Sequence, residues 1–328
     1  MKVLVTGGAG FIGSTVSSAC LDAGHEVVIV DNLSKGRVEY VKGREFYEGS
    51  VGDQGLIERI FSENPDITVT IHCAARIVVP ESVTEPELYY ENNIGEGLTF
   101  LRTLEKVGCR NLIFSSSGSI YDPEPDFSVS EESSLVAGSP YSRTKLMLEW
   151  ILRDYAKTGR IKVLSLRYFN PVGCDPLMRT GLQDPAPTHA LGKLIEAFEK
   201  GEPFTVTGVD WPTQDGTAIR DYIHVWDLAK AHVAAMNWIV DMQDSYDVVN
   251  LGTGRGTSVR ELVDAFALAV GQPVRVVESG PRPGDVVGCY TRSDKAKSLL
   301  GWEAEKSLED GIRDSLTWVK RRREILGE

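Results

Sequence analysis

The fold of this chain is decided by its opening stretch KVLVTGGAGFIG, residues 2–13. A short apolar, β-branched run comes first, as in a buried parallel strand, and residues 14–23 then have the composition of a helix that ends at Gly24. Glycines at positions 7, 10 and 13 allow a tight turn, close approach to a pyrophosphate, and close packing of helix on strand. The first amide groups of the helix would face the phosphates. The stretch therefore predicts a dinucleotide-binding strand–turn–helix unit.

A carboxylate after the next predicted strand indicates which dinucleotide is bound. That strand covers residues 26–30, and Asp31 follows it directly. A carboxylate in this position accepts hydrogen bonds from the adenosine ribose hydroxyls and repels a 2′-phosphate. We therefore expect NAD rather than NADP as the cofactor.

Strands and helices continue to alternate through the first half of the chain. This alternation predicts an α/β fold built on a Rossmann-type doubly wound parallel sheet. Further strands are expected at residues 45–48, 68–75, 111–114 and 161–169, with helices at 54–62, at 87–107 and from Pro140.

The second half is expected to form a smaller C-terminal α/β domain that binds the substrate. Residues 171–187 are rich in Pro, Gly and Asp and are expected to form a loop. We predict an NAD-binding Rossmann domain over residues 1–170 and a mainly substrate-binding domain over 171–328, with a late strand near 247–251 joining the first domain. Helices are expected at 190–200, 226–242, 258–270 and 307–323, extended segments at 204–207 and 274–277, and a turn at 281–285.

Tyr141 and Lys145 are the candidate catalytic pair. Four residues apart on a helix that begins near Pro140, they would share one face. A phenol ionises near pH ~10, and an ammonium group beside it is expected to lower that pKa. The pair would then move a proton to and from a hydroxyl while a redox cofactor moves the hydride. Serines 115–117 and 119 end the strand at 111–114, where ligands sit in an open parallel sheet.

Composition limits the other classes of function. The formal charge is −12, from 35 basic and 47 acidic residues, which argues against a nucleic-acid surface. We expect the basic run 320–323 to be a solvated last helical turn. The five cysteines are scattered and indicate neither a disulfide framework nor a zinc site. No basic-then-apolar leader and no apolar run of ~20 residues are present, so we expect a cytoplasmic protein without a membrane partner or a metal.

Six motifs resemble the extended short-chain dehydrogenase/reductase family and, within it, the UDP-glucose/UDP-galactose 4-epimerases. The glycine turn and the segment PYSRTK, residues 140–145, are typical of the superfamily. The segments LRYFNP, residues 166–171, and RDYIHV, residues 220–225, are narrower and point to the epimerase branch. The others are FSSS, residues 114–117, and NLGTG, residues 250–254.

The resemblance implies a role for each matching position. Tyr141 is similar to the catalytic base and Lys145 to its partner, and Ser117 to the hydroxyl that binds the 4-oxygen of the sugar. The implied NAD contacts are Gly7, Gly10, Phe11, Ile12, Gly13, Asp31, Asn32, Ser34, Lys35, Gly36, Ser50, Val51, Ala74, Ala75, Arg76, Asn93, Tyr141, Lys145 and Phe169. The implied contacts to the UDP-sugar are Ser117, Ser119, Tyr141, Asn170, Thr188, His189, Arg220, Arg282, Asp285 and Cys289. An ion pair of Arg220 with Asp221 or Asp227 is the structural alternative to its binding role.

The implied reaction inverts C4 of the sugar through a transient 4-keto compound. The hydride leaves C4 and returns to its other face, so NAD is tightly bound and recycled rather than exchanged. The resemblance also implies a homodimer built on helices of the first domain.

Departures from the family pattern leave the sugar open. Ile77 and Ser50 stand where a lysine near the cofactor and an aspartate that reaches the adenine amino group are frequent. Thr188 and His189 replace two asparagines near the sugar, and Cys289 falls at a gate where a small residue admits N-acetyl sugars. We favour UDP-glucose/UDP-galactose, with UDP-glucuronate/UDP-galacturonate or UDP-GlcNAc/UDP-GalNAc as alternatives. A nucleotide-sugar 4,6-dehydratase is disfavoured because Ser119-Ile120 replaces its Asp-Glu pair, and a non-catalytic NAD sensor because Ser117, Tyr141 and Lys145 are all present.

Overall fold

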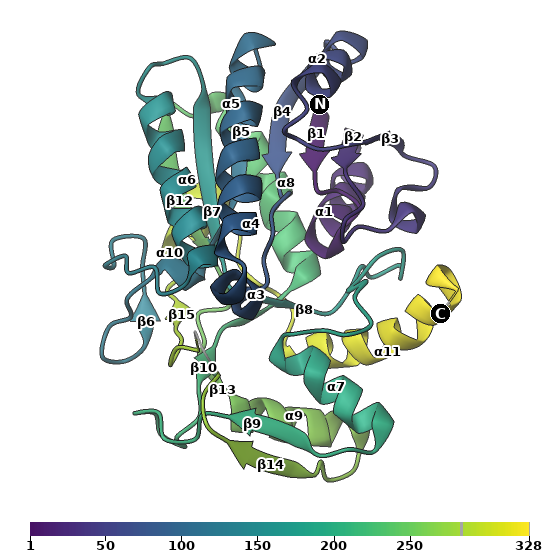
Figure 1. Ribbon diagram of the computed structural model, residues 1–328, viewed down its shortest axis with the longest axis vertical. Helices are drawn as coiled ribbons and strands as arrows, with labels where there is room; N and C mark the ends of the chain where they lie inside the picture. The colour runs from purple at the N-terminus through teal and green to yellow at the C-terminus, as the bar shows by residue number, and fades with distance from the viewer. Residues whose placement is uncertain (283–284, 328) are drawn as a thin grey trace.

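A seven-stranded parallel sheet forms the centre of the computed structural model, which describes residues 1–282 and 285–327 (Figure 1). Its strand order is β12-β7-β5-β4-β1-β2-β3, and every neighbouring pair is parallel. The order reverses between β1 and β4, as in a doubly wound sheet. The predicted Rossmann-type fold is therefore confirmed. The strands are β1 (Lys2–Thr6), β2 (Glu26–Asp31), β3 (Glu45–Glu48), β4 (Ile67–His72), β5 (Asn111–Ser117), β6 (Ser128–Val129), β7 (Lys162–Tyr168), β8 (Asn170–Val172), β9 (Phe204–Thr207), β10 (Ile219–Arg220), β11 (Tyr222–His224), β12 (Tyr246–Leu251), β13 (Thr257–Ser258), β14 (Val276–Ser279) and β15 (Tyr290–Thr291).

Helices cover both faces of this sheet. The α-helices are α1 (Phe11–Asp22), α2 (Gln54–Glu63), α3 (Val79–Thr84), α4 (Pro86–Tyr89), α5 (Gly97–Lys106), α6 (Pro140–Ala156), α7 (Ala190–Lys200), α8 (Val225–Asp241), α9 (Val259–Val270), α10 (Asp294–Leu300) and α11 (Leu308–Leu326). Short helical turns are η1 (Val38–Val41) and η3 (Gly118–Ile120), both 3-10, and the π-helix η2 (Tyr90–Glu96). Helices α1, α8 and α10 pack on one face, and α2, α5 and α6 on the other. No helix within the described residues is long and apolar enough to cross a membrane.

The glycine turn between β1 and α1 has the backbone geometry that its sequence predicts. Val3, Leu4 and Val5 are fully buried in the sheet. Gly7 has φ +67°, a left-handed conformation that favours glycine. A Cβ on Gly13 would lie 2.2 Å from the carbonyl oxygen of Gly7, so helix and turn approach as closely as only glycine permits.

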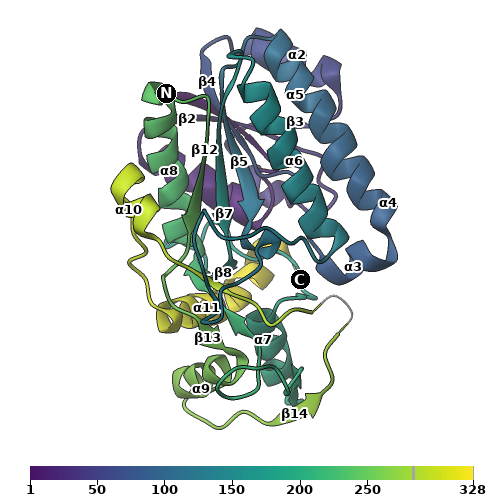
Figure 2. The same cartoon turned by 90° about the vertical axis from the view of Figure 1, so that its left-hand side faces the viewer.

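Part of the second half of the chain packs at the carboxyl end of the sheet, where the strand arrows of β1 and β4 point, whereas β12 belongs to the sheet and α8 and α10 cover one of its faces (Figure 1). Helices α7, α9 and α11 share one apolar core with β8, β9 and β11. The short parallel pair β6–β15 joins the two halves of the chain, because Ser128 pairs with Tyr290. Figure 2 shows α7 and α9 below the sheet in the second view as well.

Two predictions about helices are corrected by the structure. The single helix expected over residues 87–107 is divided into α4, η2 and α5, with a π-helical turn that contains Asn93. The last turn of α11 is not wholly solvated: Arg322 is buried and donates from Nη1 to the carbonyl oxygen of Asp184 at 3.0 Å. The turn predicted at residues 281–285 lies partly outside the described residues, since 283–284 are not described.

Candidate active site

Helix α6 carries the candidate catalytic pair. Ser139 caps the helix by accepting a hydrogen bond from the Ser142 amide at 3.1 Å, and Pro140 occupies the first turn, where its lack of an N–H costs no helical hydrogen bond. This start places Tyr141 in the first turn and Lys145 in the second. Lys145 is only 4% exposed, whereas Tyr141 is partly open.

The Lys145 ammonium group is held by the end of β5. Its Nζ donates to the carbonyl oxygen of Ser115 at 2.8 Å and lies 5.0 Å from the centre of the Phe114 ring. Burial lowers the pKa of Lys145 to about 8, against the favourable charges of Cys73 and Glu149. Lys145 therefore remains mostly protonated at neutral pH.

The expected lowering of the Tyr141 pKa by Lys145 is wrong for this structure. Burial raises the pKa of Tyr141, and the opposing cause is a side-chain hydrogen bond with Ser117. The Lys145 ammonium group donates instead to the Ser115 carbonyl oxygen. The fold does bring Ser117 and Tyr141 together, although they are 24 residues apart in the sequence.

Hydroxyl groups continue from Ser117 into the start of α6. Ser117 Oγ donates to Ser119 Oγ at 3.0 Å, and Ser142 Oγ donates to the same atom at 3.1 Å. Two of the predicted sugar contacts, Ser117 and Ser119, thus lie beside the cap of the catalytic helix.

The NAD side of the site is organised by Asp31. Its carboxylate accepts from the amides of Ala9 at 3.0 Å and Leu33 at 2.8 Å, which ties the glycine turn to the loop containing Asn32, Ser34 and Lys35. A Cβ on Gly36 would lie 2.8 Å from an Asp31 oxygen. Gly10 has only one neighbour near its missing Cβ, Gly7 O at 3.4 Å, so this side of the turn is free for a ligand. These features fit a dinucleotide with its pyrophosphate at the start of α1, beside Phe11 and Ile12.

Small residues at the end of β4 lie across the glycine turn. The Ala74 amide donates to Thr6 Oγ1 at 3.2 Å, and a Cβ on Gly7 would lie 2.8 Å from that amide nitrogen. Ala75 and Arg76 continue this segment. The Arg76 amide donates to Asn93 Oδ1 at 2.8 Å, and Asn93 Nδ2 donates to Thr144 Oγ1 at 3.0 Å. Asn93 therefore connects the segment to the catalytic helix.

Asn170 and Arg220 lie next to each other on the substrate side. The Asn170 amide donates to the Asp221 carbonyl at 3.0 Å, where β8 pairs with β11. Arg220 donates to the carbonyls of Ile219 and Val287, at 2.7 and 3.1 Å, rather than to a carboxylate. The alternative of an ion pair with Asp221 or Asp227 is therefore wrong.

Phe169 and Cys289 both lie against the turn after Ser117. A Cβ on Gly118 would lie 2.4 Å from the Phe169 ring, and Cys289 Sγ lies 3.9 Å from the Gly118 carbonyl oxygen. Cys289 is 171 residues away in sequence, and the fold places its small thiol at the edge of the candidate sugar site.

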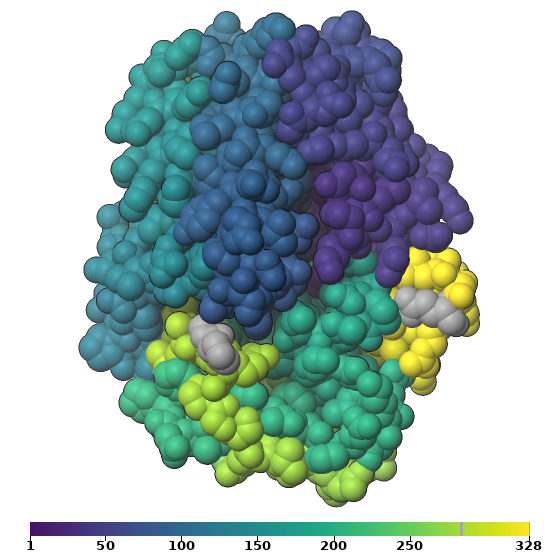
Figure 3. All heavy atoms as spheres, in the orientation of Figure 1, coloured from purple at the N-terminus to yellow at the C-terminus, as the bar shows by residue number. Residues whose placement is uncertain are grey.

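Thr188 and His189 come directly before helix α7, and His189 is its N-cap. His189 Nδ1 accepts from the Gly192 amide at 3.2 Å, so Nε2 carries the proton, and this buried atom has no partner within the described residues. Burial lowers the pKa of His189 to about 4, which leaves the ring uncharged. His189 and Phe11 line a pocket of about 370 Å³ between α7 and α11. Figure 3 shows the surface hollowed where the blue, purple and teal segments meet.

Arg282 and Asp285 pair with each other. Arg282 Nη2 lies 3.1 Å from Asp285 Oδ1, and its amide donates to Oδ2 at 2.9 Å. Within the described residues the Arg282 side chain bonds Asp285 alone, and it remains about half exposed.

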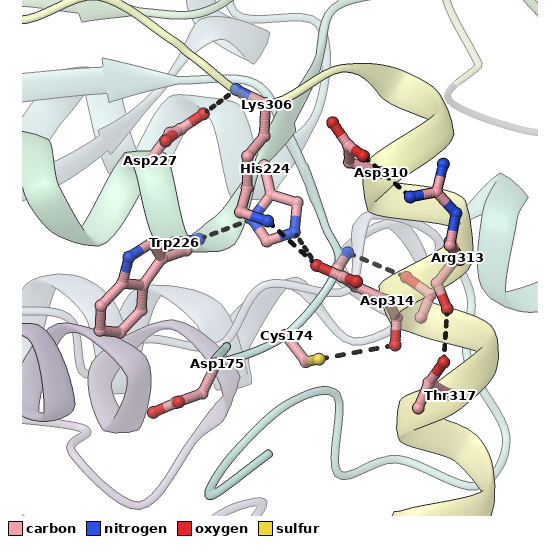
Figure 4. A network of polar contacts seen from close by, with 12 residues as sticks. Cys174, Asp175, His224, Trp226, Asp227, Lys306, Asp310, Arg313, Asp314 and Thr317 are labelled. Atoms are coloured by element: carbon pink, nitrogen blue, oxygen red, sulfur yellow. Dashed lines mark hydrogen bonds and ion pairs between the residues drawn. The ribbon is translucent and has the colours of Figure 1, made fainter. Parts of the chain in front are cut away.

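A polar network joins the end of β11 to helix α11 (Figure 4). His224, at the end of β11, accepts from the Trp226 amide at Nδ1 and therefore donates from Nε2 to Asp314 on α11, at 3.0 Å. Lys306 reaches the same carboxylate at 3.3 Å. The last helix is thereby fixed to the strand that follows Arg220.

Comparison with known proteins identifies the family that the sequence motifs resemble, over nearly the whole chain. The model of the NAD dependent epimerase/dehydratase family matches residues 3–252. UDP-glucose 4-epimerase 2 of Arabidopsis thaliana and UDP-glucose 4-epimerase of Bacillus subtilis are each 41% identical, over 97% of this chain and 95% and 96% of theirs. The chain belongs to this family, in its UDP-glucose 4-epimerase branch. A crystal structure of UDP-glucose-4-epimerase from Stenotrophomonas maltophila, with bound NAD and formylated UDP-arabinopyranose, has a TM-score of 0.94 at 36% identity and covers 100% of both chains.

Sequence reasoning missed a buried ion pair behind α6, the helix that carries the candidate catalytic pair. Glu149 and Arg167 are 2% and 4% exposed and form two hydrogen bonds, of 2.9 and 2.6 Å, that join α6 to β7. Tyr121 accepts from Arg167 at 2.7 Å and donates to Asn250 on β12 at 2.6 Å. A usable signal was available: Glu149 follows Lys145 by four residues and so lies on the face of α6 that meets the sheet.

Proposed function

We propose that this protein is an NAD-dependent UDP-sugar 4-epimerase, an isomerase whose first substrate pair is UDP-glucose/UDP-galactose. The observation that carries the proposal is the approach of Ser117 to Tyr141, with buried Lys145 on the same helix, between the Asp31 glycine turn and the Arg220 segment. The relatives with 41% identity are named as UDP-glucose 4-epimerases, and the similar crystal structure contains NAD.

Tyr141 and Ser117 manage the proton of the sugar 4-hydroxyl. Ser117 holds the 4-oxygen, and Tyr141 takes its proton as a phenolate and later returns it. Lys145, whose ammonium group donates to the Ser115 carbonyl, holds a positive charge one helical turn from Tyr141 and belongs to the surface that would hold the cofactor. NAD, when bound in this site, would supply the hydride chemistry at C4 of the sugar. Asp31, Phe11, Ile12 and Asn93 belong to the surface that keeps the cofactor in place, so that it is recycled.

The diphosphate end of the substrate is bound by the second half of the chain. Asn170 and Arg220 lie side by side at β8 and β10–β11, and the exposed fork of Arg282 can leave Asp285 to meet phosphate oxygens. A fixed diphosphate lets the 4-keto sugar turn over without leaving the site. We propose that residues 1–170 with β12 bind NAD and that residues 171–328 mainly bind UDP.

Two features bear on the particular sugar. Uncharged His189 gives little attraction to a uronate carboxylate, because its pKa is lowered to about 4. Cys289, a small side chain against Gly118, leaves room for an N-acetyl group and makes UDP-GlcNAc/UDP-GalNAc the second candidate pair.

The test is to incubate the full-length protein with single UDP-hexoses, UDP-N-acetylhexosamines and UDP-uronates and to measure the epimer ratio at equilibrium. Turnover of UDP-glucose is expected, with absorbance at the reduced-nicotinamide band rising transiently. Turnover of the uronates alone would refute the hexose assignment. Loss of water from the sugar would support a 4,6-dehydratase, and no turnover with retained NAD would support a sensor.

We also propose a homodimer in the cytoplasm. Trp150 is 48% exposed on the outer side of α6, a position suited to packing against a second copy. All five cysteines are free, which suits a reducing compartment.

A further inference from the structure

Glu96 is placed by the fold beside the strand end that follows Asp31. Ser50 Oγ donates to Glu96 Oε2, and the Gly52 amide donates to Ser50 Oγ at 3.0 Å. A Cβ on Gly52 would lie 2.8 Å from Glu96 Cγ, so the glutamate side chain lies directly over this turn. The π-helical geometry of η2, which ends at Glu96, brings these residues together over 46 positions of sequence.

This turn lies next to the ribose-binding carboxylate. Glu48, the last residue of β3, pairs with Asp31, and the Gly49 amide donates to the Asp31 carbonyl at 3.0 Å. The adenine ring is bonded to the ribose that Asp31 is proposed to hold, on the β1-β2-β3 half of the sheet. Ser50 and Glu96 therefore stand at the edge where the adenine ring must lie.

The Glu96 carboxylate has acceptor capacity to spare at this edge. Oε2 is engaged by Ser50, and Oε1 accepts no hydrogen bond within residues 1–282 and 285–327. The exocyclic amino group of adenine is a donor, and a carboxylate accepts from it more strongly than a neutral hydroxyl does.

We propose that Glu96 is the residue that recognises the adenine amino group of NAD, with Ser50 orienting its carboxylate. This inference rests on the proposed NAD cofactor. The serine at position 50 then costs no recognition of adenine, because the acceptor comes from η2 rather than from the turn after β3.

The test compares NAD with nicotinamide hypoxanthine dinucleotide, in which a carbonyl oxygen replaces the amino group. The full-length protein is equilibrated with an equimolar excess of both, freed of unbound dinucleotide, and the bound ratio is measured by mass spectrometry after acid release. Equilibrium is verified by starting from either dinucleotide. The wild type is expected to retain NAD, because the hypoxanthine oxygen faces a carboxylate. Glu96→Gln is expected to shift the ratio toward the analogue by about tenfold or more, the size of one hydrogen bond to a charged group.

Matched variants separate recognition from folding. Glu91→Gln, on the exposed side of η2, is expected to keep the wild-type ratio. Adding Ser50→Asp to Glu96→Gln returns a carboxylate to the edge and is expected to restore the preference for NAD. A Glu96→Gln protein with an unchanged ratio would overturn the proposal, even if its affinity for both dinucleotides fell. A wild-type protein that retains neither dinucleotide would overturn both the role of Glu96 and the proposed NAD cofactor. Loss of epimerisation alone would leave the role of Glu96 standing.

Discussion

Lys145 and Ser115 are joined by a hydrogen bond of 2.8 Å from the lysine Nζ to the serine carbonyl oxygen, across the interface between α6 and β5. This bond buries an ammonium group in the sheet side of the catalytic helix. A charge buried in this way costs stability, and the site retains it because the chemistry needs it.

Lys145→Met is expected to raise the free energy of unfolding by about 2 kcal/mol at pH 7, because the cost of burying the charge exceeds the contribution of the single lost hydrogen bond. The same variant is expected to be inactive. The folded pKa of about 8 lies below the ordinary 10.5, so the unfolded chain binds more protons between these values. Wild-type stability therefore gains with pH across this window, and the advantage of the variant shrinks from pH 8 to pH 10. Urea unfolding of both proteins at pH 7, 8 and 10 measures this. A constant difference would contradict the lowered pKa.

Tyr141→Phe is expected to lower kcat by about 10²- to 10⁴-fold, the range for loss of a general acid–base group. The aromatic ring keeps the packing at the start of α6, so bound NAD should persist at the wild-type level. The check is the rate of UDP-glucose conversion together with the NAD released on denaturation. Tyr155→Phe, a tyrosine farther along the same helix, serves as control. Activity within tenfold of wild type would exclude Tyr141 as the base.

Replacing either Glu149 or Arg167 alone by leucine is expected to cost about 3–5 kcal/mol, because the remaining charge is buried without its partner. The double replacement should cost less than the sum of the two. A double-mutant cycle in urea measures the coupling. The exposed pair Lys157–Asp154 on the same helix provides the comparison and is expected to contribute less than about 1 kcal/mol. Equal costs at the two pairs would show that the buried pair is not energetically special.

Two glycines of the first turn should respond differently to alanine. Gly13→Ala places a Cβ 2.2 Å from the Gly7 carbonyl oxygen, so the melting temperature is expected to fall by several degrees. Gly10 has φ −87°, and its new Cβ would meet only Gly7 O at 3.4 Å. Gly10→Ala should therefore keep most of the stability and reduce NAD retention, because the methyl group occupies the phosphate approach. Thermal melting with and without added NAD distinguishes the two effects. A Gly10→Ala protein that retains NAD normally would place the pyrophosphate elsewhere.

Cys289→Tyr is expected to suppress turnover of UDP-GlcNAc more than that of UDP-glucose. The tyrosine ring is larger than the thiol and fills the space against Gly118 that an N-acetyl group would need. The ratio of kcat/KM for the two sugars should change by at least about tenfold, the upper part of what steric exclusion in a pocket supplies. Cys289→Ser keeps the size of the side chain and controls for loss of the thiol. An unchanged ratio would remove Cys289 from the sugar site.

Much of the fold and the centre of the site could be predicted because they are local. The glycine turn, Asp31 at a strand end, and Tyr141 and Lys145 one helical turn apart depend on strand and helix periods that the sequence shows directly. The division of residues 87–107 by a π-helical turn has no such periodic signal, and it was missed.

The sequence by itself determined three functional segments and their order along the chain: a dinucleotide-binding turn, a serine-rich strand end and a helix with the Tyr-Lys pair. Only the tertiary structure decided that Lys145 bonds Ser115, that Cys289 lies on Gly118 across 171 positions, and that Glu96 takes the place beside Ser50. These contacts depend on how separate elements pack and on the position of each residue around its own axis. Packing of that kind follows from the whole core at once, and no single stretch of residues encodes it.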